Sequence, residues 1–390
     1  MLKTVETRDQ LVELFKSDKE FFEKFLKGRT SERKIRQMFE KGVIASNGEF
    51  DYLSEATKSA VFRAGGSSIM DWGCWHAEGE DITCRRISTR DVETIEIQGV
   101  EIQVPLGYVV TLPQKLYDDM ANVARNTHEA IRKRVKGSKI LTRLDYIVVD
   151  KNTAYIVDVG ESNTSLGVSD AVYQFAGLGE GDNLKKYVER VIAYLADVKQ
   201  VVLVAEDEAM LKDLGYEFQI LSNIILECYG LKSHTITKEQ LQGEMPDTGY
   251  IRCFRRPFAT NIPLIDDVSS IPVYSKENIL KILAELTLPE RIHAPKSYVI
   301  DSTATAEDVL ETVRENGLED FVVKPISKGK KSSIAFLYTV NNPAHTRQLA
   351  KAIRKIRSAG IKQLMIEENI GSSVADGRKL EVRVHCLSNI

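Results

Sequence analysis

The sequence reads Arg143-Leu144-Asp145-Tyr146-Ile147-Val148-Val149-Asp150-Lys151-Asn152-Thr153-Ala154-Tyr155-Ile156-Val157-Asp158 at the place that decides the fold. Two apolar runs of strand type flank the polar turn at 150–152, which predicts an antiparallel hairpin. Asp145 and Asp158 then lie on paired strands, where their carboxylates could converge on one Mg²⁺. The alternative is a surface β-ribbon that carries these acids by chance.

Composition limits the classes of protein that this chain can represent. It has 390 residues, of which 43% are hydrophobic and 28% charged, as in globular proteins. At about 150 residues per domain this length predicts two or three domains. The 56 acidic and 53 basic residues give a net charge of −3, which argues against a general nucleic-acid binder.

Cysteine usage and apolar runs indicate the compartment. The five cysteines form no C-x-x-C pair, which fits a reducing environment. The first residues are not of signal-peptide type, and no apolar run approaches the roughly 18 residues of a membrane-spanning helix. We therefore expect a cytoplasmic protein with no membrane partner and no nucleic-acid partner.

Helices and strands alternate around the hairpin. The spacing of apolar residues predicts helices within 1–45 and over 113–137. Residues 46–90 read as irregular, and residues 94–112 alternate like strands. Between 198 and 260 the order strand, helix, strand favours a small parallel sheet.

A lysine and a polar loop follow a buried-type strand further along the chain. Lys324 ends the apolar run that begins at Phe321, and the loop 327–333 comes directly after it. Backbone amides and ammonium groups of such a loop could close over a triphosphate. Taken alone, a basic surface loop is the more common meaning of this pattern.

Two further segments could bind nucleotide together with this loop. Lys276 opens a predicted helix upstream of Lys324. Glu367 and Glu368 end a predicted strand, where backbone amides could bind an adenine edge and a carboxylate could bind ribose. Each segment alone is equally compatible with a solvated lysine or an ordinary strand end.

The last predicted strand, 379–387, has one charged face. Arg383 alternates in phase with Glu381 and His385. Strands that bury such a face generally line a site, because a buried and unpaired charge is costly.

An aromatic cluster stands at Trp72-Gly73-Cys74-Trp75-His76. It could form a substrate pocket or hold a reactive thiol, but aromatic packing is the more common role of such a cluster. Cys74 has no recognisable His or Asn partner pattern, so we do not assign it as a nucleophile.

A resemblance to the ATP-grasp superfamily rests on four elements in order: Lys276, Lys324, the Glu367–Glu368 pair and Arg383. The run 376–383 looks like the corresponding strand of tubulin tyrosine ligase-like members. The hairpin and the polar run 160–166 resemble the Arg-x-Asp and Glu-x-Asn strands of circularly permuted ATP-grasp enzymes, the group that includes glutathionylspermidine synthase. In that group the metal-binding hairpin precedes the lysine half.

The resemblance implies an α+β or α/β fold. Its parts would be an ATP-grasp core in circularly permuted order, a small parallel α/β (pre-ATP-grasp-like) domain and a helical N-terminus. Four regions follow: an N-terminal helical and β region over 1–135, the metal-binding hairpin half over 136–196, a small α/β substrate-side domain over 197–270, and the ATP-binding lysine half over 271–390.

The resemblance also implies ATP and Mg²⁺ as cofactors. The implied nucleotide ligands are Lys276, Lys324, Ser327, Lys328, Gly329, Lys330, Ser332, Glu367 and Glu368. The implied metal ligands are Asp145, Asp158, Glu161 and Asn163. The implied catalytic residues, which would stabilise oxyanion and phosphate charge, are Arg383 and Arg143.

The hairpin departs from the family pattern at two positions. Asp158 stands where the family usually has Glu, and Gly160 stands where it has Asn. Either Glu161 or Asn163 is then expected to take the role of that Asn through a one-residue shift; the alternative is that the second metal is held differently.

These inferences predict an ATP- and Mg²⁺-dependent ligase that joins a carboxylate, through an acyl phosphate, to an amine. The substrates would be small-molecule or peptide carboxylates and amines, with a peptide-like or polyamine-like acceptor. The alternative is a catalytically inactive ATP-grasp protein that binds nucleotide or serves as an interaction module. The identity of the acid and amine and the oligomeric state are left open.

Overall fold

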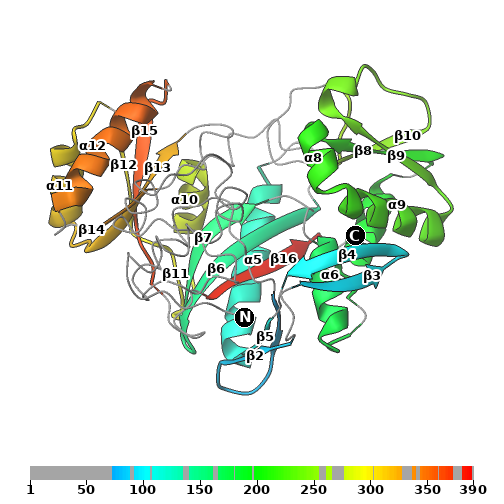
Figure 1. Cartoon of the computed structure of the whole chain (residues 1–390), viewed down its shortest axis with the longest axis horizontal. Coiled ribbons are helices and arrows are strands. Elements are labelled where there is room, and N and C mark those ends of the chain that lie inside the picture. The colour runs from blue at the N-terminus through cyan, green and yellow to red at the C-terminus, as the bar shows by residue number, and fades with distance from the viewer. Residues whose placement is uncertain are drawn as a thin grey trace, which may run out of the picture. The chain divides into compact units, whose positions relative to one another are not determined.

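The computed structural model describes most of the chain from Gly73 onward (Figure 1). The described residues are 73–87, 92–105, 108–134, 140–160, 166–179, 181–195, 197–253, 261–265, 276–301, 303–326, 336–339, 343–358, 360–371 and 380–388. The helices expected within 1–45 therefore lie outside the described residues.

Contacts divide the chain into two compact units, which are described separately below. Unit 1 joins Met1–Asp71 to Lys296–Asn369, and unit 2 joins Trp72–Pro295 to Ile370–Ile390. Both mix helices with sheets, as the expected α+β or α/β class requires. The four regions expected from the sequence stay a prediction.

A four-stranded sheet in unit 2 contains the predicted hairpin. Its strands, in spatial order, are β11 (Ile292–His293), β7 (Thr153–Gly160), β6 (Leu141–Asp150) and β16 (Leu380–Leu387). Strand β6 pairs antiparallel with both β7 and β16, and β11 pairs parallel with β7. The hairpin is thus confirmed, and the strand predicted near the end of the chain lies directly beside it.

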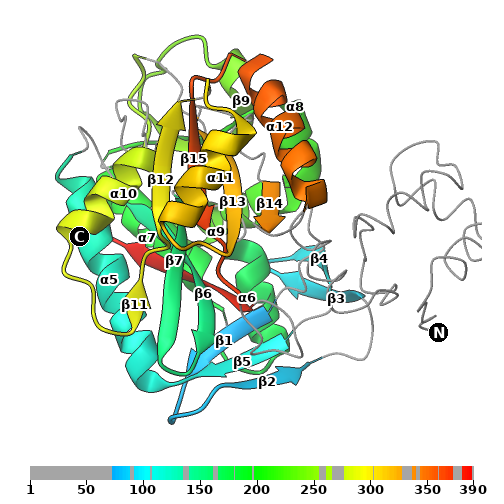
Figure 2. The same cartoon turned by 90° about the vertical axis from the view of Figure 1, so that its left-hand side faces the viewer.

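Helix α5 (Gln114–Arg132) covers one face of this sheet (Figure 2). The even-numbered positions of β6 and β16 pack in a core with α5 and α10 (Lys276–Glu285): Leu144, Tyr146, Val148, Val382, Val384 and Cys386. The Tyr146 hydroxyl donates a hydrogen bond of 2.8 Å to the Met120 carbonyl of α5. The odd-numbered positions of β6 and β16 therefore face away from α5.

Two strands occur in the segment that the sequence marks as irregular. Strand β1 (Gly73–Ala77) pairs parallel with β5 (Tyr108–Leu112), and β2 (Thr83–Arg86) pairs antiparallel with β5. The prediction was wrong here, because Thr-Cys-Arg-Arg is short, polar and largely exposed and shows no apolar alternation. Pairing with β5 makes it a strand.

The rest of unit 2 surrounds a second core. The hairpin of β3 (Val92–Ile97) and β4 (Val100–Pro105) turns through Gln98 and Gly99, whose φ angles are +51° and +71°. Such angles are typical of two-residue hairpin turns. The helices packed in this core are α6 (Leu166–Phe175), α7 (Asn183–Tyr194) and α9 (Gly215–Tyr229).

The predicted small parallel sheet is confirmed. Its order is β10 (Thr248–Arg252), β8 (Gln200–Ala205) and β9 (Lys232–Thr237), all parallel. Helices α8 (Glu208–Asp213) and α9 connect β8 to β9, and the 3₁₀ turn Lys238–Gln240 follows β9. In the described part of the chain, no helix is both long enough and apolar enough to cross a membrane.

Unit 1 contains an antiparallel sheet with helices on one side (Figure 1). The sheet order is β12 (Ser297–Asp301), β15 (Gln363–Glu368), β13 (Asp320–Ile326) and β14 (Phe336–Thr339). Helices α11 (Ala306–Glu315) and α12 (Pro343–Ser358) pack in one core with Phe321 and Val323 of β13 and Leu364 and Ile366 of β15. Alternation then places Lys324 and Glu367 on the other face of the sheet.

Candidate active site

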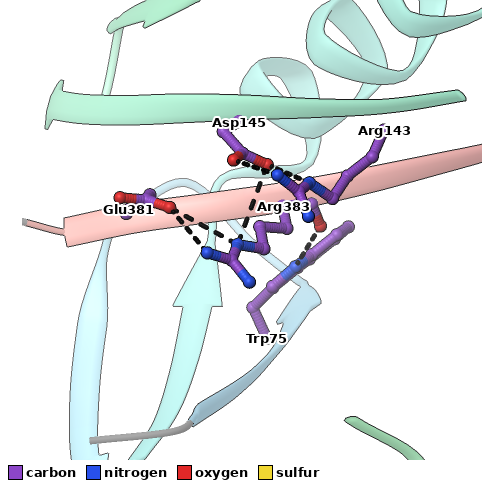
Figure 3. Close-up of polar contacts among 5 residues, drawn as sticks. All are labelled: Trp75, Arg143, Asp145, Glu381 and Arg383. Atoms are coloured by element: carbon purple, nitrogen blue, oxygen red, sulfur yellow. Dashed lines mark hydrogen bonds and ion pairs between the residues drawn. The ribbon is translucent and has the colours of Figure 1, made fainter. Parts of the chain in front are cut away.

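Charged side chains line the face of the hairpin sheet that points away from α5 (Figure 3). As the alternation of the last strand predicted, those on β6 and β16 stand at odd-numbered positions, and Asp158 joins them from β7. We call this set the charged face; its members are Arg143, Asp145, Asp158, Glu381, Arg383 and His385.

A β-bulge in β7 turns Asp158 to the charged face. Ile156 packs in the core with α5, so unbroken alternation would send Asp158 there too. Tyr146 pairs with Ile156, whereas its predecessor Asp145 pairs with Asp158. Val157 is thus an extra residue on β7, and such bulges re-aim side chains beside functional sites. Asp158 is exposed and stands opposite Asp145.

Arg143 and Asp145 form a buried ion pair within β6. Arg143 Nη2 donates a hydrogen bond of 2.9 Å to Asp145 Oδ2, and Arg143 Nε lies 2.7 Å from Oδ1. The two side chains are only 3% and 6% exposed. Burial opposes the charge of Arg143, but Asp145 and then Asp158 outweigh burial, and the pKa of Arg143 is raised. Arg143 is therefore a fixed positive charge.

Arg383 of β16 stands opposite Asp145 in the sheet register. Its Nε lies 3.7 Å from Asp145 Oδ1, and its Nη2 donates a 3.2 Å hydrogen bond to Glu381 Oε1. The Trp75 indole Nε1 donates a 3.2 Å hydrogen bond to the Arg383 carbonyl (Figure 3). Strand β1 thereby contacts the outer edge of β16.

Asp145 ionises less readily than an ordinary aspartate. Burial raises the pKa of Asp145 to about 6, against the opposing effects of Arg143 and Arg383, and the carboxylates of Asp158 and Glu381 add to the rise. A cation bound beside these carboxylates would favour the ionised form.

His385 pairs with Arg143 in the register of β16 and β6. Burial, followed by the charges of Arg143 and Arg383, lowers the pKa of His385 to about 3. On the other side of β6, Gly160 pairs with Arg143. A Cβ at Gly160 would lie 3.1 Å from Arg143 Nη2, so the guanidinium occupies the place where a side chain would begin.

In unit 1, the two predicted nucleotide ligands Lys324 and Glu367 form an ion pair. Their side chains are 14% and 9% exposed. Glu368 has different partners: its carboxylate accepts a 3.2 Å hydrogen bond from the Lys296 backbone, and its own N–H donates a 2.8 Å bond to the Lys296 carbonyl. Of these two acids, Glu367 thus pairs with a lysine side chain and Glu368 with backbone groups.

Several predicted site residues cannot be placed. Lys276 is the first residue of α10, as predicted, but its side chain is not described. The following lie outside the described residues: Glu161, Asn163, Ser327, Lys328, Gly329, Lys330 and Ser332. Among the residues that the structure describes, no group of three or more His, Cys, Asp or Glu side chains is arranged to hold a metal ion. Asp145 and Asp158 form a two-carboxylate set.

The sequence did not indicate the contacts that His385 and Trp75 make in this region. The alternation of β16 pointed to His385, but its pairing with Arg143 depends on a register that only the fold reveals. Trp75 was expected to pack, and its ring does lie 5.1 Å from that of Tyr117. Its hydrogen bond to β16 joins segments far apart in the chain, so no local pattern predicts it.

The chain was compared with known protein families, curated proteins and solved structures. No protein-family model matches the chain, and no curated protein matches its sequence. Among solved structures, one similar to this chain is described as "Putative gamma-glutamylcysteine synthetase" from Methylobacillus flagellatus KT, with a TM-score of 0.42 and 12% identity over 70% of this chain and 77% of the other.

A second similar structure is a glutathione synthetase like-effector, GSS30, from Globodera pallida. Its TM-score is 0.40, with 10% identity over 71% of this chain and 85% of the other. Similarity at this level assigns neither a fold family nor an activity to this chain.

Proposed function

We propose that the chain is an ATP- and Mg²⁺-dependent ligase with a circularly permuted ATP-grasp arrangement, which joins a carboxylate to a peptide-like or polyamine-like amine. The observation that carries this proposal is the bulge in β7. It sets the carboxylate of Asp158 beside that of Asp145, on a sheet face that also bears Arg143 and Arg383. A surface ribbon with chance acids would have no need of a buried arginine such as Arg143.

The proposed reaction has two steps. A carboxylate oxygen of the acid attacks the γ-phosphorus of ATP, ADP leaves, and an acyl phosphate forms. The amine nitrogen then attacks the acyl carbon, phosphate leaves with the bonding electrons, and the nitrogen loses a proton. Positioning and charge stabilisation supply most of the catalysis in such transfers.

The carboxylates of the charged face fit Mg²⁺. Mg²⁺ in phosphoryl-transfer sites is usually held by one or two carboxylates together with phosphate oxygens, and Asp145 and Asp158 are such a pair. Burial raises the pKa of Asp145, and a cation bound beside it would favour the ionised form. When bound, Mg²⁺ would neutralise charge on phosphate oxygens. Glu161 or Asn163 would complete the donor set.

The basic residues would stabilise the transferred charge. Arg143 and Arg383 would act on the oxyanion and the phosphate oxygens. Lys324, Lys276 and the loop 327–333 would act on the nucleotide phosphates, with Glu367 and Glu368 for the nucleoside. The loop would also exclude water, which otherwise hydrolyses the acyl phosphate.

An acceptor screen tests the proposal. Small acids and peptides are crossed with amines in the presence of MgATP, and phosphate release and product mass are measured. We expect at least one pair to give acceptor-dependent phosphate and a product lighter than the summed substrates by one water. Asp158→Asn is the matched control, since it removes a charge and keeps the volume.

A second candidate is a protein of the same arrangement that binds nucleotide without ligase chemistry. Gly160 favours it, because the Arg143 guanidinium lies where the side chain of the family's Asn would begin. Binding of MgADP without acceptor-dependent release of phosphate from ATP in the full screen would select this candidate.

A further inference from the structure

Arg143 and His385 lie side by side on the charged face. They are directly paired across β6 and β16, and paired residues of antiparallel strands project to the same face with Cβ atoms about 4.5–5.5 Å apart. The third strand contributes Gly160 to this row, which has no side chain to compete for the space. The row therefore holds one guanidinium and one imidazole.

The Nη1 group of Arg143 has no hydrogen-bond acceptor among the described residues. Nη2 donates to Asp145 Oδ2, whereas Nε lies 2.7 Å from Asp145 Oδ1 as an ion pair without hydrogen-bond alignment. Nη1 is also buried. A guanidinium has no acceptor atoms, so only an acceptor such as an oxygen can satisfy Nη1.

His385 has a matching orphan atom. Its Nε2 is buried and has no hydrogen-bond partner among the described residues. The ring is neutral because burial and two arginines disfavour the imidazolium, so Nε2 carries a proton in one of the two tautomers. The charges that act on it, Arg143 and Arg383, are both positive, which favours an anionic group at this position.

Two unsatisfied buried polar atoms on adjacent positions require an explanation. Buried donors in native proteins are almost always paired, and unpaired ones mark strain, a functional role or a missing ligand. Replacing a buried polar atom that has no partner by an apolar one should stabilise the protein. The unpaired atom therefore lowers the free energy of unfolding and contributes no structural contact.

We propose that Arg143 Nη1 and His385 Nε2 together form a seat for one anionic oxygen of a ligand. In the proposed ligase, on which this reading of the ligand rests, the oxygen belongs to the carboxylate of the acid substrate or to a phosphoryl group. Both share the same chemistry, and the seat takes either oxygen through the N–H groups of Arg143 Nη1 and His385 Nε2. His385 is thereby assigned to ligand binding, beside the catalytic arginines.

The seat can be tested without nucleotide and without turnover. The chain has six histidines, so the full protein labelled with ¹⁵N-histidine gives a sparse ring spectrum. The His385 signals are identified by their loss in His385→Leu. Sodium acetate and sodium phosphate are titrated separately at pH 7, each against sodium chloride at matched ionic strength.

We expect the His385 ring signals to shift saturably with acetate, with phosphate or with both, but not with chloride, while the signals of His234 in β9 stay in place. A response to acetate alone identifies a carboxylate seat, and a response to phosphate alone identifies a phosphoryl seat. A response in neither arm would mean that these atoms bind water only, and it would overturn the proposal.

Gly160→Ala supplies a variant in which His385 stays visible. Its Cβ would lie 3.1 Å from Arg143 Nη2, so the guanidinium must shift by a few tenths of an ångström, and we expect weaker anion binding. Gly243→Ala is the matched control, because nothing lies within 4 Å of its new Cβ. Equal binding in both variants would remove Arg143 from the seat.

His385→Leu separates binding from folding. Because Nε2 has no partner, the variant should melt at the same temperature as the wild type or higher, while stabilisation by the responding anion is lost. A lower melting temperature would show a structural role instead. A ligase that works without anion binding at His385 overturns only the seat, whereas anion binding without any ligase product overturns only the proposed reaction.

Discussion

Each of the two units holds an ion pair on a sheet face, yet the two pairs differ in their surroundings. In unit 1 Lys324 pairs with Glu367, and the side chains are 14% and 9% exposed. In unit 2 Arg143 pairs with Asp145, and the side chains are 3% and 6% exposed. Asp145 has two further carboxylates nearby, those of Asp158 and Glu381.

The difference shows that pairing alone does not set the charge state of a buried acid. Asp145 accepts a hydrogen bond from Arg143, and Arg383 is a second cation nearby. Burial still dominates and raises the pKa of Asp145 to about 6. The charged face carries three carboxylates, those of Asp145, Asp158 and Glu381, beside its two arginines, so a bound cation would favour their ionised forms.

The largest effect is expected from breaking the pair in unit 1. Lys324→Met leaves Glu367 buried without its cation, which costs about 3–5 kcal/mol of unfolding free energy. The double variant Lys324→Met/Glu367→Leu should regain most of this loss, since both charged groups are replaced by apolar ones. Urea denaturation measures both.

The same two variants separate folding from nucleotide binding. MgADP at 100 times its dissociation constant should stabilise the wild type by about 2.7 kcal/mol. The double variant should fold and yet show no such stabilisation. A full response to MgADP in the double variant would contradict the assignment of Lys324 to phosphate binding.

A pH dependence distinguishes the charged face. The pKa of Asp145 is raised from 3.8 to about 6, so between these values the native state keeps a proton that the unfolded chain has lost, and stability falls as pH rises. The pKa of His385 is lowered from 6.5 to about 3, so the unfolded chain binds the proton first, and stability falls as pH falls through this window.

His385→Leu isolates the second contribution. At pH 7 the histidine is neutral in both states, so the difference between variant and wild type should contain no proton-linked part. As pH falls from 7 to 4 the variant should gain up to about 3 kcal/mol over the wild type. Urea denaturation at several pH values measures this gain; a difference independent of pH would mean that His385 titrates normally in the native state.

Asp158→Asn tests the metal-site reading of the hairpin. The exposed side chain keeps its volume and loses a charge that repels Asp145, so the melting temperature without ligand should stay the same or rise slightly. Acceptor-dependent phosphate release should fall about 100-fold or more, because metal stabilisation is needed most in the transition state. Nucleotide binding should weaken only modestly.

The opposite pattern would contradict the assignment of Asp158 as a metal ligand. A large loss of melting temperature, with residual activity that follows the folded fraction, would make Asp158 a structural residue. Glu381→Gln is a useful companion, because Glu381 shares the charged face but was not predicted to bind metal. Its effect on phosphate release should be the smaller of the two.

The sequence predicted those parts of the fold whose signals are local. The hairpin of β6 and β7 was predictable because apolar runs flank a polar turn. The charged side of β16 followed from alternation alone.

Other parts depend on partners far away in the chain. Helix α6 was not predicted, and its first turn is capped from a distance: Glu217 of α9 accepts hydrogen bonds from the Gly167 and Val168 amides at 3.0 and 3.3 Å. Gly167 permits this contact, since a Cβ there would lie 2.8 Å from the Glu217 carboxylate. No rule that reads neighbouring residues can find such a cap.

The candidate site divides in the same way. Residue types and order indicated Arg143, Asp145, Asp158 and Arg383 through a family resemblance. The bulge at Val157, which decides where Asp158 points, follows from how β7 registers on β6. Registers are set by whole-strand packing, so the pairing of His385 with Arg143 was equally hidden.

Trp75→Phe gives the smallest expected effect and compares the two sheets directly. The variant keeps a ring next to Tyr117 but loses the indole N–H that bonds to the Arg383 carbonyl at the outer edge of β16. One such hydrogen bond contributes about 1 kcal/mol, which corresponds to a fall of about 2–4 °C in melting temperature for a domain of 150–250 residues. Hydrogen–deuterium exchange should quicken in β16, because its edge is held less firmly, whereas β15 in the other unit should keep its protection. Equal changes in β15 and β16 would mean that Trp75 stabilises the protein as a whole; no change in either would mean that the strand edge is held by its pairing with β6 alone.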